Sequence, residues 1–535
     1  MKRVFNECLQ EYCGRDYYPW HMPGHKRQEV PLFEIEAPGK LKGLGAGLDV
    51  TEVPGLDNLL APEGILAESM AQLSEVYGSW KSYYLVNGST SGIQTAVSAV
   101  CNPGDTIIMS RNCHKAVYNI VALLNLKPVY LYPRIMEPYG ICGSITPTQV
   151  EKALHEHPEA KAVIFPSPTY EGVLSDVRSI SEIVHRAGGR LIVDEAHGAH
   201  LEFGKGFPDS AIRCGADLVI ESLHKTLPCY TQCAILHIGG AETGSMKLGG
   251  KKDRSVKTGE SAENRIDDQE LIQRVERYLG VYQTSSPSYL FVAAMEDCIA
   301  TMEEWRQTRM AEYYSRLKYY RKKWMGLKWI RLLTTEEVRR AGVFAYDESK
   351  LIFCMPEHTW TGEEFRKELE EEFGMVLEMA SLNYVLAMTS VADRENGYER
   401  LHLALQEMDR RASQCRLLKK AGEKSEDNRH KSTIEVKADR ASNSNPEPAR
   451  FLPGEAIHKK SKAILLAEVA GEIAGDYVTV YPPGIPVLVP GEQISALQRD
   501  YIVKCIQGGL TVHGMVQDSS GQKEKLHYIK VLVEG

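Results

Sequence analysis

Seven short apolar runs recur between residues 60 and 240, separated by longer stretches in which polar and apolar residues mix. Each run is rich in β-branched or aromatic side chains and apolar at nearly every position. Such short continuous runs are typical of strands buried on both faces, as in a parallel sheet covered by helices. The predicted strands are YYLV (83–86), TIIM (106–109), PVYL (128–131), AVIF (162–165), LIV (191–193), DLVI (217–220) and AILHI (234–238).

The stretches between these runs have helical character and end at glycine or proline. NPGD (102–105) and AGG (187–189) are such helix stops. The alternation predicts an α/β fold with a mostly parallel central sheet. Ligands of such sheets bind beyond the carboxyl ends of the strands, and Asp194, which follows LIV, is expected at that edge.

The remaining chain divides by composition. The segment 239–268 is rich in Gly, Lys and Ser and is expected to be a mobile loop, whereas KLIFCM (350–355) reads as a strand in a helix-rich region. The stretch that begins at residue 417 is highly charged and has too few large apolar side chains to offset the conformational entropy that ordering would cost. We therefore expect an N-terminal arm (1–60), a large domain (61–290), a small α+β domain (291–416), a disordered charged linker (417–454) and a C-terminal domain (455–535).

The bulk composition limits the partners. The 535 residues carry a formal net charge of -8, so nothing favours a nucleic-acid-binding basic face. No apolar run approaches the roughly 18 to 20 residues of a membrane span, and the N-terminus lacks the apolar stretch of a signal peptide. The 12 cysteines form no C-x-x-C pair. We expect a cytoplasmic protein with reduced thiols, without nucleic-acid or membrane partners.

The stretch LIVDEAHGAH (191–200) allows three kinds of site: a nucleotide hydrolase, a metal site, or a cofactor site that needs a buried anion. A hydrolase needs a phosphate loop, and neither SMKLGGKK (245–252) nor GLGAGL (43–48) has the required spacing. His197 and His200 would need a third ligand to hold a metal. Two loop histidines that bind backbone groups are favoured over a metal site, so no metal is expected.

Two further stretches favour the cofactor. In ESLHKTLPCYTQ (221–232), Lys225 follows a predicted buried strand; on this stretch alone, a surface lysine that extends to solvent is the favoured interpretation. If buried, its amine has a lowered pKa and can attack a carbonyl to form a Schiff base. In VNGSTSGIQ (86–94), Ser89 and Thr90 open a predicted helix, where they can bind an anion or simply cap the helix.

Together these stretches match the needs of pyridoxal 5'-phosphate. The hydroxyl-rich helix start would take the phosphate, Lys225 would form the Schiff base, and Asp194 would face the pyridine nitrogen and keep it protonated. The phosphate loop, the aspartate and the lysine also occur in this order along the chain. The combination is far more specific than any single motif.

With these motifs in place, the sequence resembles the bacterial ornithine/lysine/arginine decarboxylase family of fold type I pyridoxal-phosphate enzymes. It looks like the short form that lacks an N-terminal receiver-like domain. The resemblance implies a fold type I large domain, a smaller α+β domain and a C-terminal decarboxylase domain. The matching stretches are HMPGHK (21–26), LDVTEVPGLDNL (48–59), VNGSTSG (86–92), RNCHKA (111–116), FPSPTYEGV (165–173), DEAHGAH (194–200), SLHKTLP (222–228), QTSSPSYL (283–290) and YPPGIPVLVPGE (481–492).

The resemblance also implies roles for individual residues. Lys225 is expected to form the Schiff base, Asp194 to bind the pyridine nitrogen and His114 to stack on the cofactor ring. The other expected cofactor contacts are Ser89 and Thr90 at the phosphate, Ser222 and His224 beside it, Ala196 on the opposite ring face, His197 at the phenolic oxygen and Ser285 from a neighbouring subunit. The enzyme is therefore expected to be a homodimer or a higher homo-oligomer with its active site at the subunit interface.

The implied reaction is decarboxylation of a basic L-amino acid to its amine in polyamine-type metabolism. Arginine and lysine, which give agmatine and cadaverine, lead over ornithine, and Lys225 or His224 would protonate Cα. The distal cation needs a carboxylate, and for Asp49, Glu52 and Asp57 the alternative is a solvated loop charge. The candidates are Asp49, Glu52, Asp57 and Glu492. Another fold type I enzyme, an aminotransferase or an oxoamine synthase, remains the alternative function.

Overall fold

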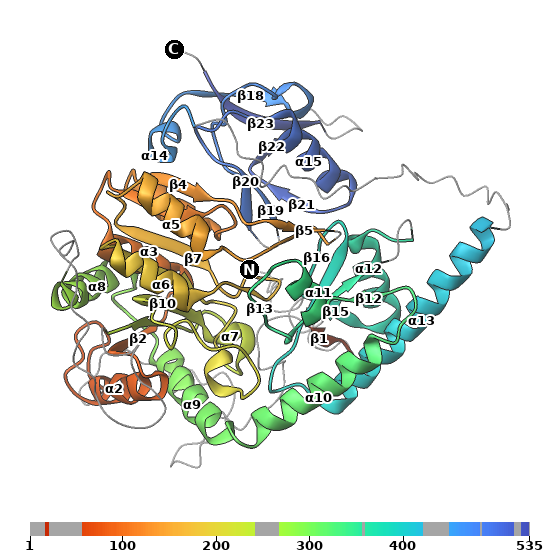
Figure 1. The fold of residues 1–535 in the computed structure, drawn as a ribbon, viewed down its shortest axis with the longest axis horizontal. Coiled ribbons are helices and arrows are strands. Elements are labelled where there is room, and N and C mark those ends of the chain that lie inside the picture. The colour runs from red at the N-terminus through yellow and green to blue at the C-terminus, as the bar shows by residue number, and fades with distance from the viewer. Residues whose placement is uncertain are drawn as a thin grey trace, which may run out of the picture.

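The computed structural model describes residues 16–20, 56–137, 139–240, 267–355, 359–420, 449–481, 484–517 and 526–533. The described chain forms a large domain around one central sheet, a smaller domain beside it, and a C-terminal domain that lies next to β4 of the large domain (Figure 1). HMPGHK and most of the predicted loop 239–268 lie outside the described residues.

The large domain is built on a seven-stranded sheet with the order β2-β11-β10-β9-β7-β3-β4. Each predicted strand coincides with one strand of this sheet, so that prediction is confirmed. β11 runs antiparallel to β2 and β10, and the other neighbours are parallel, which makes the sheet mostly parallel. The strands are β2 (Lys81–Leu85), β3 (Thr106–Ser110), β4 (Lys127–Leu131), β7 (Ala162–Pro166), β9 (Arg190–Asp194), β10 (Leu218–Ser222) and β11 (Ala234–Ile238).

Helices cover this sheet, and for that reason β3, β9, β10 and β11 are buried at every position. α3 packs on β9, β10 and β11, and it also contacts α4 and α8. α5 and α6 pack on each other, α5 also packs on β4, and α6 also packs on β9. The helices are α2 (Ile65–Tyr77), α3 (Gly88–Val100), α4 (Lys115–Leu123), α5 (Pro147–Glu156), α6 (Val177–Arg186), α7 (Leu223–Thr226) and α8 (Asp268–Tyr282). Short elements complete the domain: β5 (Ile135–Met136), β6 (Ile141–Cys142), β8 (Val173–Leu174) and the 3-10 turn η2 (Leu201–Phe203).

The carboxyl ends of β2, β3, β9 and β10 meet at one edge of the sheet because these strands are mutually parallel. The antiparallel β11 brings its amino end to the same edge, where Ala234 pairs with both Leu85 and Ser222. Gly92 lets α3 lie directly on this part of the sheet, since a Cβ there would stand 2.6 Å from Leu85 Cδ1 and 2.9 Å from Ile220 Cγ2. The loops that leave this edge carry the candidate site.

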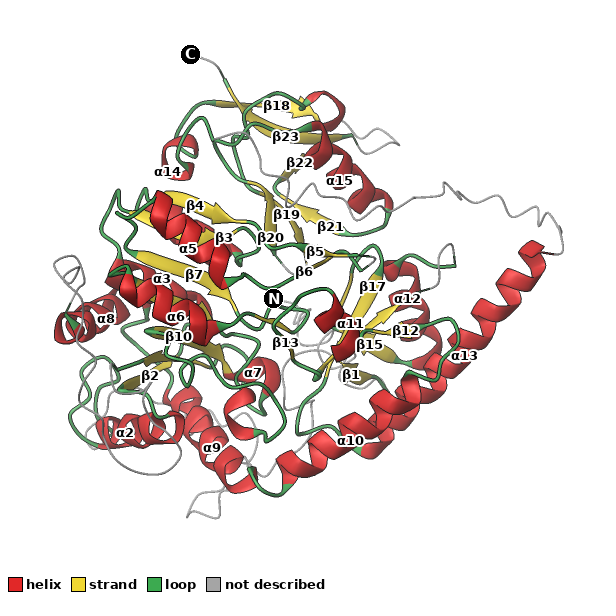
Figure 2. Cartoon of the chain, viewed as in Figure 1, coloured by secondary structure: helices red, strands yellow, loops and turns green. Residues whose placement is uncertain are grey.

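The small domain is α+β, with an antiparallel sheet of order β12-β14-β17-β16. The long helix α9 (Tyr289–Trp305) leads into it, and α10 and α13 pack along each other at its outer side (Figure 2). β1 (Tyr18–Trp20), from the predicted N-terminal arm, pairs with β15. The other elements are α10 (Arg309–Trp324), β12 (Arg331–Leu332), α11 (Thr335–Arg340), β13 (Ala345–Tyr346), β14 (Lys350–Cys354), α12 (Gly362–Phe373), β15 (Met375–Leu377), β16 (Met379–Ala380), β17 (Tyr384–Met388) and α13 (Glu395–Lys420).

The C-terminal domain has a core of its own, formed where α15 packs against two three-stranded sheets. α13 extends through residues 417–420, where the charged linker was predicted to begin, and most of that linker lies outside the described residues. The elements are α14 (Pro453–Ala456), β18 (Ser461–Leu465), η6 (Leu466–Glu468), β19 (Val478–Tyr481), β20 (Ile485–Leu488), α15 (Ala496–Gln507), β21 (Thr511–His513), β22 (Met515–Gln517) and β23 (His527–Leu532).

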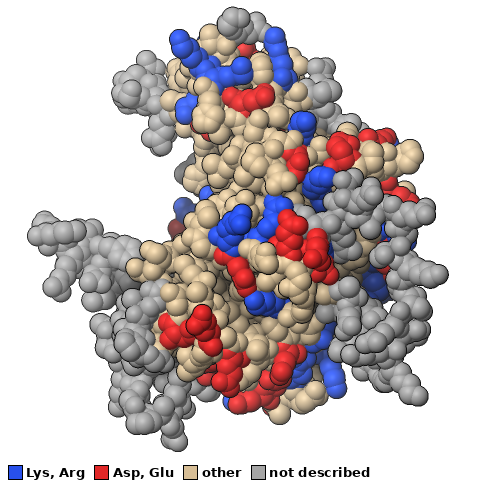
Figure 3. All heavy atoms as spheres, turned by 90° about the vertical axis from the view of Figure 1, so that its left-hand side faces the viewer, with Lys and Arg blue, Asp and Glu red and all other residues tan. Residues whose placement is uncertain are grey.

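The surface mixes charges of both signs. On the face shown in Figure 3, described basic and acidic side chains are interspersed over the large domain, and neither sign covers a continuous area there. Among the described residues, no helix combines the length and apolar character needed to cross a membrane.

Candidate active site

Lys225 lies just beyond the carboxyl end of β10, in the single helical turn α7. The turn is tied to the sheet edge because the Leu223 N–H donates to the carbonyl of Cys233 at 3.1 Å. The Lys225 side chain turns inward, and its Nζ lies 2.9 Å from His197 Nε2. Burial lowers the pKa of Lys225, while the carboxylates of Asp194 and Glu378 oppose that effect. Lys225 is therefore an inward-facing amine rather than a surface lysine.

Asp194 is the last residue of β9 and lies on the strand next to the one that carries Lys225. Its side chain is buried, and among the described residues its carboxylate accepts one hydrogen bond, from the Ala196 N–H at 3.2 Å. Burial raises the pKa of Asp194, and the Lys225 charge and the Ala196 N–H lower it. A buried carboxylate with so few donors is suited to a cationic or N–H partner from a ligand.

His197 connects the Asp194 loop to Lys225. Its ring packs against Tyr170 with the centroids 4.5 Å apart, and its Nδ1 is buried without a partner among the described residues. Burial lowers the pKa of His197 well below its ordinary value, and the Lys225 and Lys350 charges lower it further. The imidazole is therefore neutral, with one nitrogen that donates and one that accepts.

The two histidines of the DEAHGAH stretch serve different partners. His200 Nε2 lies 3.2 Å from Asp347 Oδ1 in the small domain, whereas His197 contacts Lys225. Both contacts are to side chains, not to the backbone groups expected from the sequence. No cluster of three or more His, Cys, Asp or Glu side chains suited to a metal occurs in the described part of the chain.

His114 is held at the start of α4. Its Nδ1 accepts a hydrogen bond from the Ala116 N–H at 3.2 Å, which leaves Nε2 as the protonated nitrogen. Burial, with the nearby Lys225 and Lys115 charges, lowers the pKa of His114 to about 4. Gly484 of the C-terminal domain covers this ring closely, since a Cβ there would lie 3.7 Å from His114 Nε2.

The C-terminal domain is fastened to the His114 loop through Arg111. Arg111 Nη1 donates to the Pro486 carbonyl at 2.6 Å, and Nη2 donates to the Val487 carbonyl at 3.1 Å and to Glu492 Oε2 at 3.3 Å. The side chains of Arg111 and Glu492 are both 2% exposed. The C-terminal domain thus fixes the loop that carries His114.

These contacts correct two predictions about the distal cation. Glu492 Oε2 is paired with the buried guanidinium of Arg111 in its own chain, so Glu492 serves as the counter-charge of Arg111. Desolvation opposes the ionisation of Asp57, but its carboxylate accepts hydrogen bonds from four backbone N–H groups around the start of α2, and together these lower its pKa to about 2. It is a structural cap. Asp49 and Glu52 lie outside the described residues.

The predicted phosphate loop connects β2 to α3. Gly88 takes a left-handed φ of 74°, and Ser89 and Thr90 lie in the first helical turn, where backbone N–H groups have no partner within the helix. Val86, just before this turn, is held on both sides, because its N–H donates to Gln283 Oε1 at 2.8 Å and its carbonyl accepts from the Gln232 amide. The loop is therefore fixed with the helix N-terminus open to an anion.

Residues next to Lys225 test whether the site fits a phosphorylated cofactor. Ser222 Oγ and Thr226 Oγ1 are buried hydroxyls without a hydrogen-bond partner among the described residues. His224 Nδ1 lies 3.2 Å from the Cys233 carbonyl at the same sheet edge. Unpaired buried hydroxyls around an inward-facing amine, opposite a buried carboxylate, suit the phosphate, the aldehyde and the ring nitrogen of pyridoxal phosphate.

The two remaining predicted contacts differ in their setting. Ala196 is buried beside Asp194, as a residue against a cofactor ring would be. Ser285 is exposed in the segment between α8 and α9, whose neighbour Thr284 donates its N–H to Asn87 Oδ1 at 3.4 Å, next to the phosphate loop. The expected role of Ser285 in a neighbouring subunit stays a prediction.

Three residues near Lys225 were not found from the sequence. Tyr170 packs on His197 and donates its hydroxyl to Glu378, which lies between β15 and β16 of the small domain. Lys350, at the start of β14, donates to the His197 carbonyl at 3.1 Å. Only Tyr170 lies in a matching stretch, and no local pattern marks Glu378 or Lys350, because tertiary packing alone brings the small domain to this site.

Comparisons with known proteins decide the family. A family model described as "Orn/Lys/Arg decarboxylase, major domain" matches residues 4–376, and the model of the C-terminal domain of the same family matches residues 439–531. The chain belongs to the Orn/Lys/Arg decarboxylase family. It is 30% identical over 529 residues to an arginine decarboxylase of Bacillus subtilis (strain 168), which covers 98% of this chain and 97% of the relative. An arginine decarboxylase of Bacillus anthracis is 28% identical over 509 residues, or 95% and 93% of the two chains.

Solved structures support the fold. Lysine decarboxylase A from Pseudomonas aeruginosa matches with a TM-score of 0.72 at 19% identity, covering 91% of this chain and 74% of that chain. A ureidoglycine-glyoxylate aminotransferase from Bacillus subtilis matches with a TM-score of 0.53 at 12% identity, covering 75% and 95%. Decarboxylases and aminotransferases share this architecture, so the predicted fold type I α/β class is confirmed.

The family resolves the choice between the functions that the sequence left open. As a member of the Orn/Lys/Arg decarboxylase family, the chain is a carboxy-lyase for basic amino acids, as the sequence motifs predicted. An aminotransferase or oxoamine synthase is not favoured, because the likeness to an aminotransferase is one of fold alone.

Proposed function

We propose that this chain is a pyridoxal-phosphate-dependent arginine decarboxylase that converts L-arginine to agmatine and CO2. The observation that carries the proposal is the pairing of an inward-facing Lys225 amine, 2.9 Å from His197 Nε2, with the buried carboxylate of Asp194 on the neighbouring strand. The arginine decarboxylases among its relatives support arginine over lysine. The sequence alone did not separate these two substrates.

Pyridoxal phosphate would supply an electron sink for the bond that breaks at Cα. Lys225 would hold the cofactor covalently, with Asp194 at the ring nitrogen, His114 and Ala196 at the two ring faces and His197 near the phenolic oxygen. The phosphate would be bound by Ser89 and Thr90 at the start of α3, together with Ser222 and His224.

The electrostatics of the site prepare Lys225 for this role. Burial lowers the pKa of Lys225, so a larger fraction of its amine is unprotonated and nucleophilic at neutral pH. His197 Nε2 is placed to accept or return a proton at Lys225 Nζ. Lys225 is accordingly our choice for the group that delivers a proton to Cα, because His224 Nδ1 faces the Cys233 carbonyl.

Glu378 is our candidate for binding the distal cation of the substrate. It comes from the small domain, receives a hydrogen bond from Tyr170, and its charge acts on the Lys225 amine. A carboxylate can bind a guanidinium with two parallel hydrogen bonds, which suits arginine. We prefer it to Glu492, which is the counter-charge of Arg111, and to Asp57, which caps the start of α2.

Incubation of the purified protein and cofactor with arginine, lysine and ornithine, each in a separate reaction, tests the proposal. Mass spectrometry of the amines should show agmatine as the main product, and release of CO2 should match it. A Lys225→Ala variant should form no amine and lose the yellow absorbance of the bound cofactor. A keto acid product, or turnover by Lys225→Ala, would contradict the proposal.

We further infer a cytoplasmic homodimer in which Ser285 completes the site of the other subunit. Ser285 is exposed in the single chain, beside the phosphate loop, where an adjacent subunit could reach it. The buried cysteines Cys101, Cys113 and Cys229 are free thiols, which suits a reducing compartment.

A further inference from the structure

A buried charged cluster lies behind His197, between the large and small domains. Its centre is Lys350, whose side chain is 0% exposed. Lys350 Nζ donates to Asp347 Oδ2 at 2.8 Å, to the His197 carbonyl at 3.1 Å and to Ser349 Oγ at 3.2 Å. An ammonium group has three N–H donors, so all of them are matched.

Asp347 extends this cluster to a second point on the same loop of the large domain. Its Oδ1 accepts from the Ser349 N–H at 2.9 Å and lies 3.2 Å from His200 Nε2. Burial opposes ionisation, but the Lys350 and His200 contacts lower the pKa of Asp347, so it carries a charge. The small domain thus holds the 197–200 loop at both ends, through the His197 carbonyl and the His200 ring.

The backbone around Lys350 leaves little room for movement. The Asp347 N–H donates to the Gly172 carbonyl at 2.8 Å, and β13 pairs with β8 of the large domain. Gly172 has a φ of +94°, and a Cβ there would lie 2.9 Å from both the Asp347 carbonyl and Lys350 Cγ. The cluster is therefore packed directly against the large domain.

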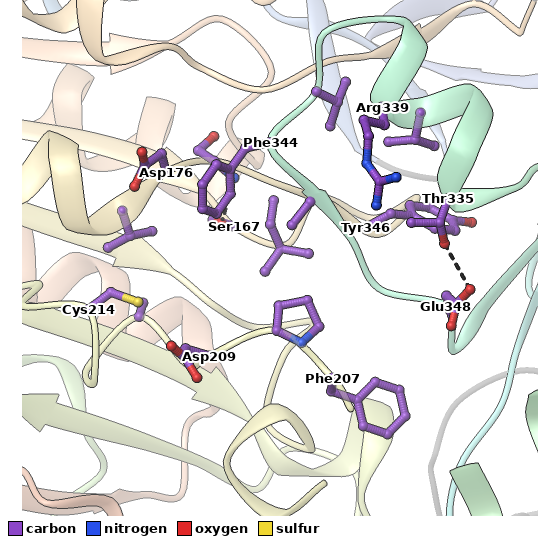
Figure 4. A pocket seen from close by; sticks show the side chains of 18 of the residues that line it. Ser167, Asp176, Phe207, Asp209, Cys214, Thr335, Arg339, Phe344, Tyr346 and Glu348 are labelled. Carbon is purple, nitrogen blue, oxygen red and sulfur yellow. Dashed lines mark hydrogen bonds between the residues drawn. The ribbon is translucent and has the colours of Figure 1, made fainter. Parts of the chain in front are cut away.

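The outer side of the same segment lines an open cleft of about 990 Å³ between the two domains. Tyr346 and Glu348 face this cleft, as Figure 4 shows, and Glu348 accepts a hydrogen bond from Thr335. Asp347, between them, belongs to the buried cluster. Successive side chains of this segment thus point to opposite sides. On the cleft side Lys318 binds Glu348, and on the buried side Asp347 belongs to the cluster that reaches His197.

We propose that Lys350 is a positioning residue for the reaction: it holds the main chain of His197 so that the imidazole stays against Lys225 Nζ. The inference rests on Lys225 being the reactive amine, as in the proposed function. Lys350 does not touch the reacting groups itself and acts through His197.

The charge of Lys350 also affects Lys225. Burial and the Lys350 charge lower the pKa of Lys225, whereas Asp194 and Glu378 raise it. The neighbouring histidines His114 and His197 have pKa values lowered by burial, and His224 lies near His197. In this balance Lys350 is the cation that opposes the two carboxylates, so its removal should favour the protonated form of the Lys225 amine.

The primary test is a Lys350→Met variant, which keeps the length of the side chain without its charge or donors. The full-length chain, without added cofactor, is labelled with an amine-reactive reagent between pH 6 and 10, and the Lys225 peptide is quantified by mass spectrometry. We expect the labelling midpoint to rise by roughly one pH unit, so that labelling at pH 8 slows about tenfold. Lys318→Met, which removes a lysine from the cleft side of the same segment, should leave the midpoint unchanged.

Lys350→Met leaves Asp347 buried without its cation and can weaken the fold, so a second variant is needed. The double variant Lys350→Met/Asp347→Asn removes both charges, and buried pairs replaced together are better tolerated than broken ones. With cofactor and arginine, we expect kcat to fall about tenfold or more while KM changes little, because the His197 carbonyl still lacks its donor.

The outcomes separate this inference from the proposed function. A folded Lys350→Met chain with the wild-type midpoint, or a folded double variant with the wild-type kcat, would overturn the role of Lys350. If the wild-type chain decarboxylates none of the three basic amino acids, the proposed function is refuted. If Lys350→Met still shifts the Lys225 midpoint in that case, the electrostatic effect of Lys350 on Lys225 stands without the function.

Discussion

Glu221 offers a sharp test of the electrostatics beside the site. It lies on β10, one residue before Ser222, and its side chain is 0% exposed. Burial raises the pKa of Glu221 to about 8; interactions with Tyr77 and Glu195 oppose this rise, and the charge of Glu202 adds to it. Glu195, also buried, has its pKa raised well above the ordinary value by burial and by Glu221. Glu221 therefore holds a proton at neutral pH.

The perturbation is Glu221→Gln, which has nearly the same shape and no proton to lose. The pKa of Glu221 is higher in the folded chain than the ordinary 4.5, so folding takes up a proton between about pH 5 and pH 8. The wild-type free energy of unfolding should fall with rising pH in this window by about 1.4 kcal/mol per unit from this group. Glutamine removes that dependence, so the variant should gain on the order of 4 kcal/mol relative to wild type between pH 5 and pH 8.

Urea unfolding followed by tryptophan fluorescence at pH 5, 6, 7 and 8 measures the difference. Glu75→Gln, on the exposed side of α2, is the matched control and should run parallel to wild type at every pH. Parallel curves for wild type and Glu221→Gln would refute the reasoning, because they would mean that Glu221 has the same charge in the folded and unfolded chains.

Further predictions concern the site itself. Asp194→Asn should keep cofactor binding, measured by visible absorbance, yet lose on the order of 10³-fold in kcat, since an ion pair worth about 4 kcal/mol at an effective dielectric near 20 would be removed. Near-normal turnover would contradict its role. The pKa of His114 is about 4 in the folded chain, against an ordinary value of 6.5. Its contribution to the free energy of unfolding is therefore present above pH 6.5 and is lost as the pH falls from 6.5 through 4. In urea titrations over this range, His114→Gln should lose less stability than wild type as the pH falls. Arg111→Met should release the C-terminal domain and raise the cofactor dissociation constant, measured by fluorescence titration, while an unchanged constant would argue against that coupling. Mixing inactive Lys225→Ala and Ser285→Trp chains should restore part of the activity through shared sites, and no recovery in verified mixed dimers would exclude a contribution of Ser285 from a neighbouring subunit.

Much of the fold was predictable because the central strands are buried on both faces. That burial leaves short continuous apolar runs in the sequence, and all seven became strands of one sheet. The direction of β11 was not predictable in the same way. Its run, AILHI, looks like the others, and its antiparallel direction depends on the connection from β10 rather than on its own residues.

The residues of the candidate site also differ in whether local sequence or only tertiary packing reveals them. Asp194 and Lys225 could be proposed from the sequence because Asp194 ends β9 and Lys225 comes three residues after the end of β10, so both lie at the same edge of the sheet. Glu492 and Asp57 were misjudged because a carboxylate in a loop looks available until its partner, Arg111 or the start of α2, is known. Glu378 and Lys350 reach the site from the small domain, more than 120 residues after Lys225, so only the folded chain brings them there.

The way Arg111 is held by Pro486, Val487 and Glu492 has a consequence for how the enzyme matures in the cell. A ribosome releases the loop that carries His114 long before it has made residues 486–492, yet three of those residues hold Arg111 of that loop. A nascent or prematurely terminated chain would therefore have the central sheet and the Lys225 amine but lack the cover over His114. Loading with cofactor should consequently be a late, post-translational event, and nonsense mutations that remove residues 484–492 should be as damaging as changes at Lys225.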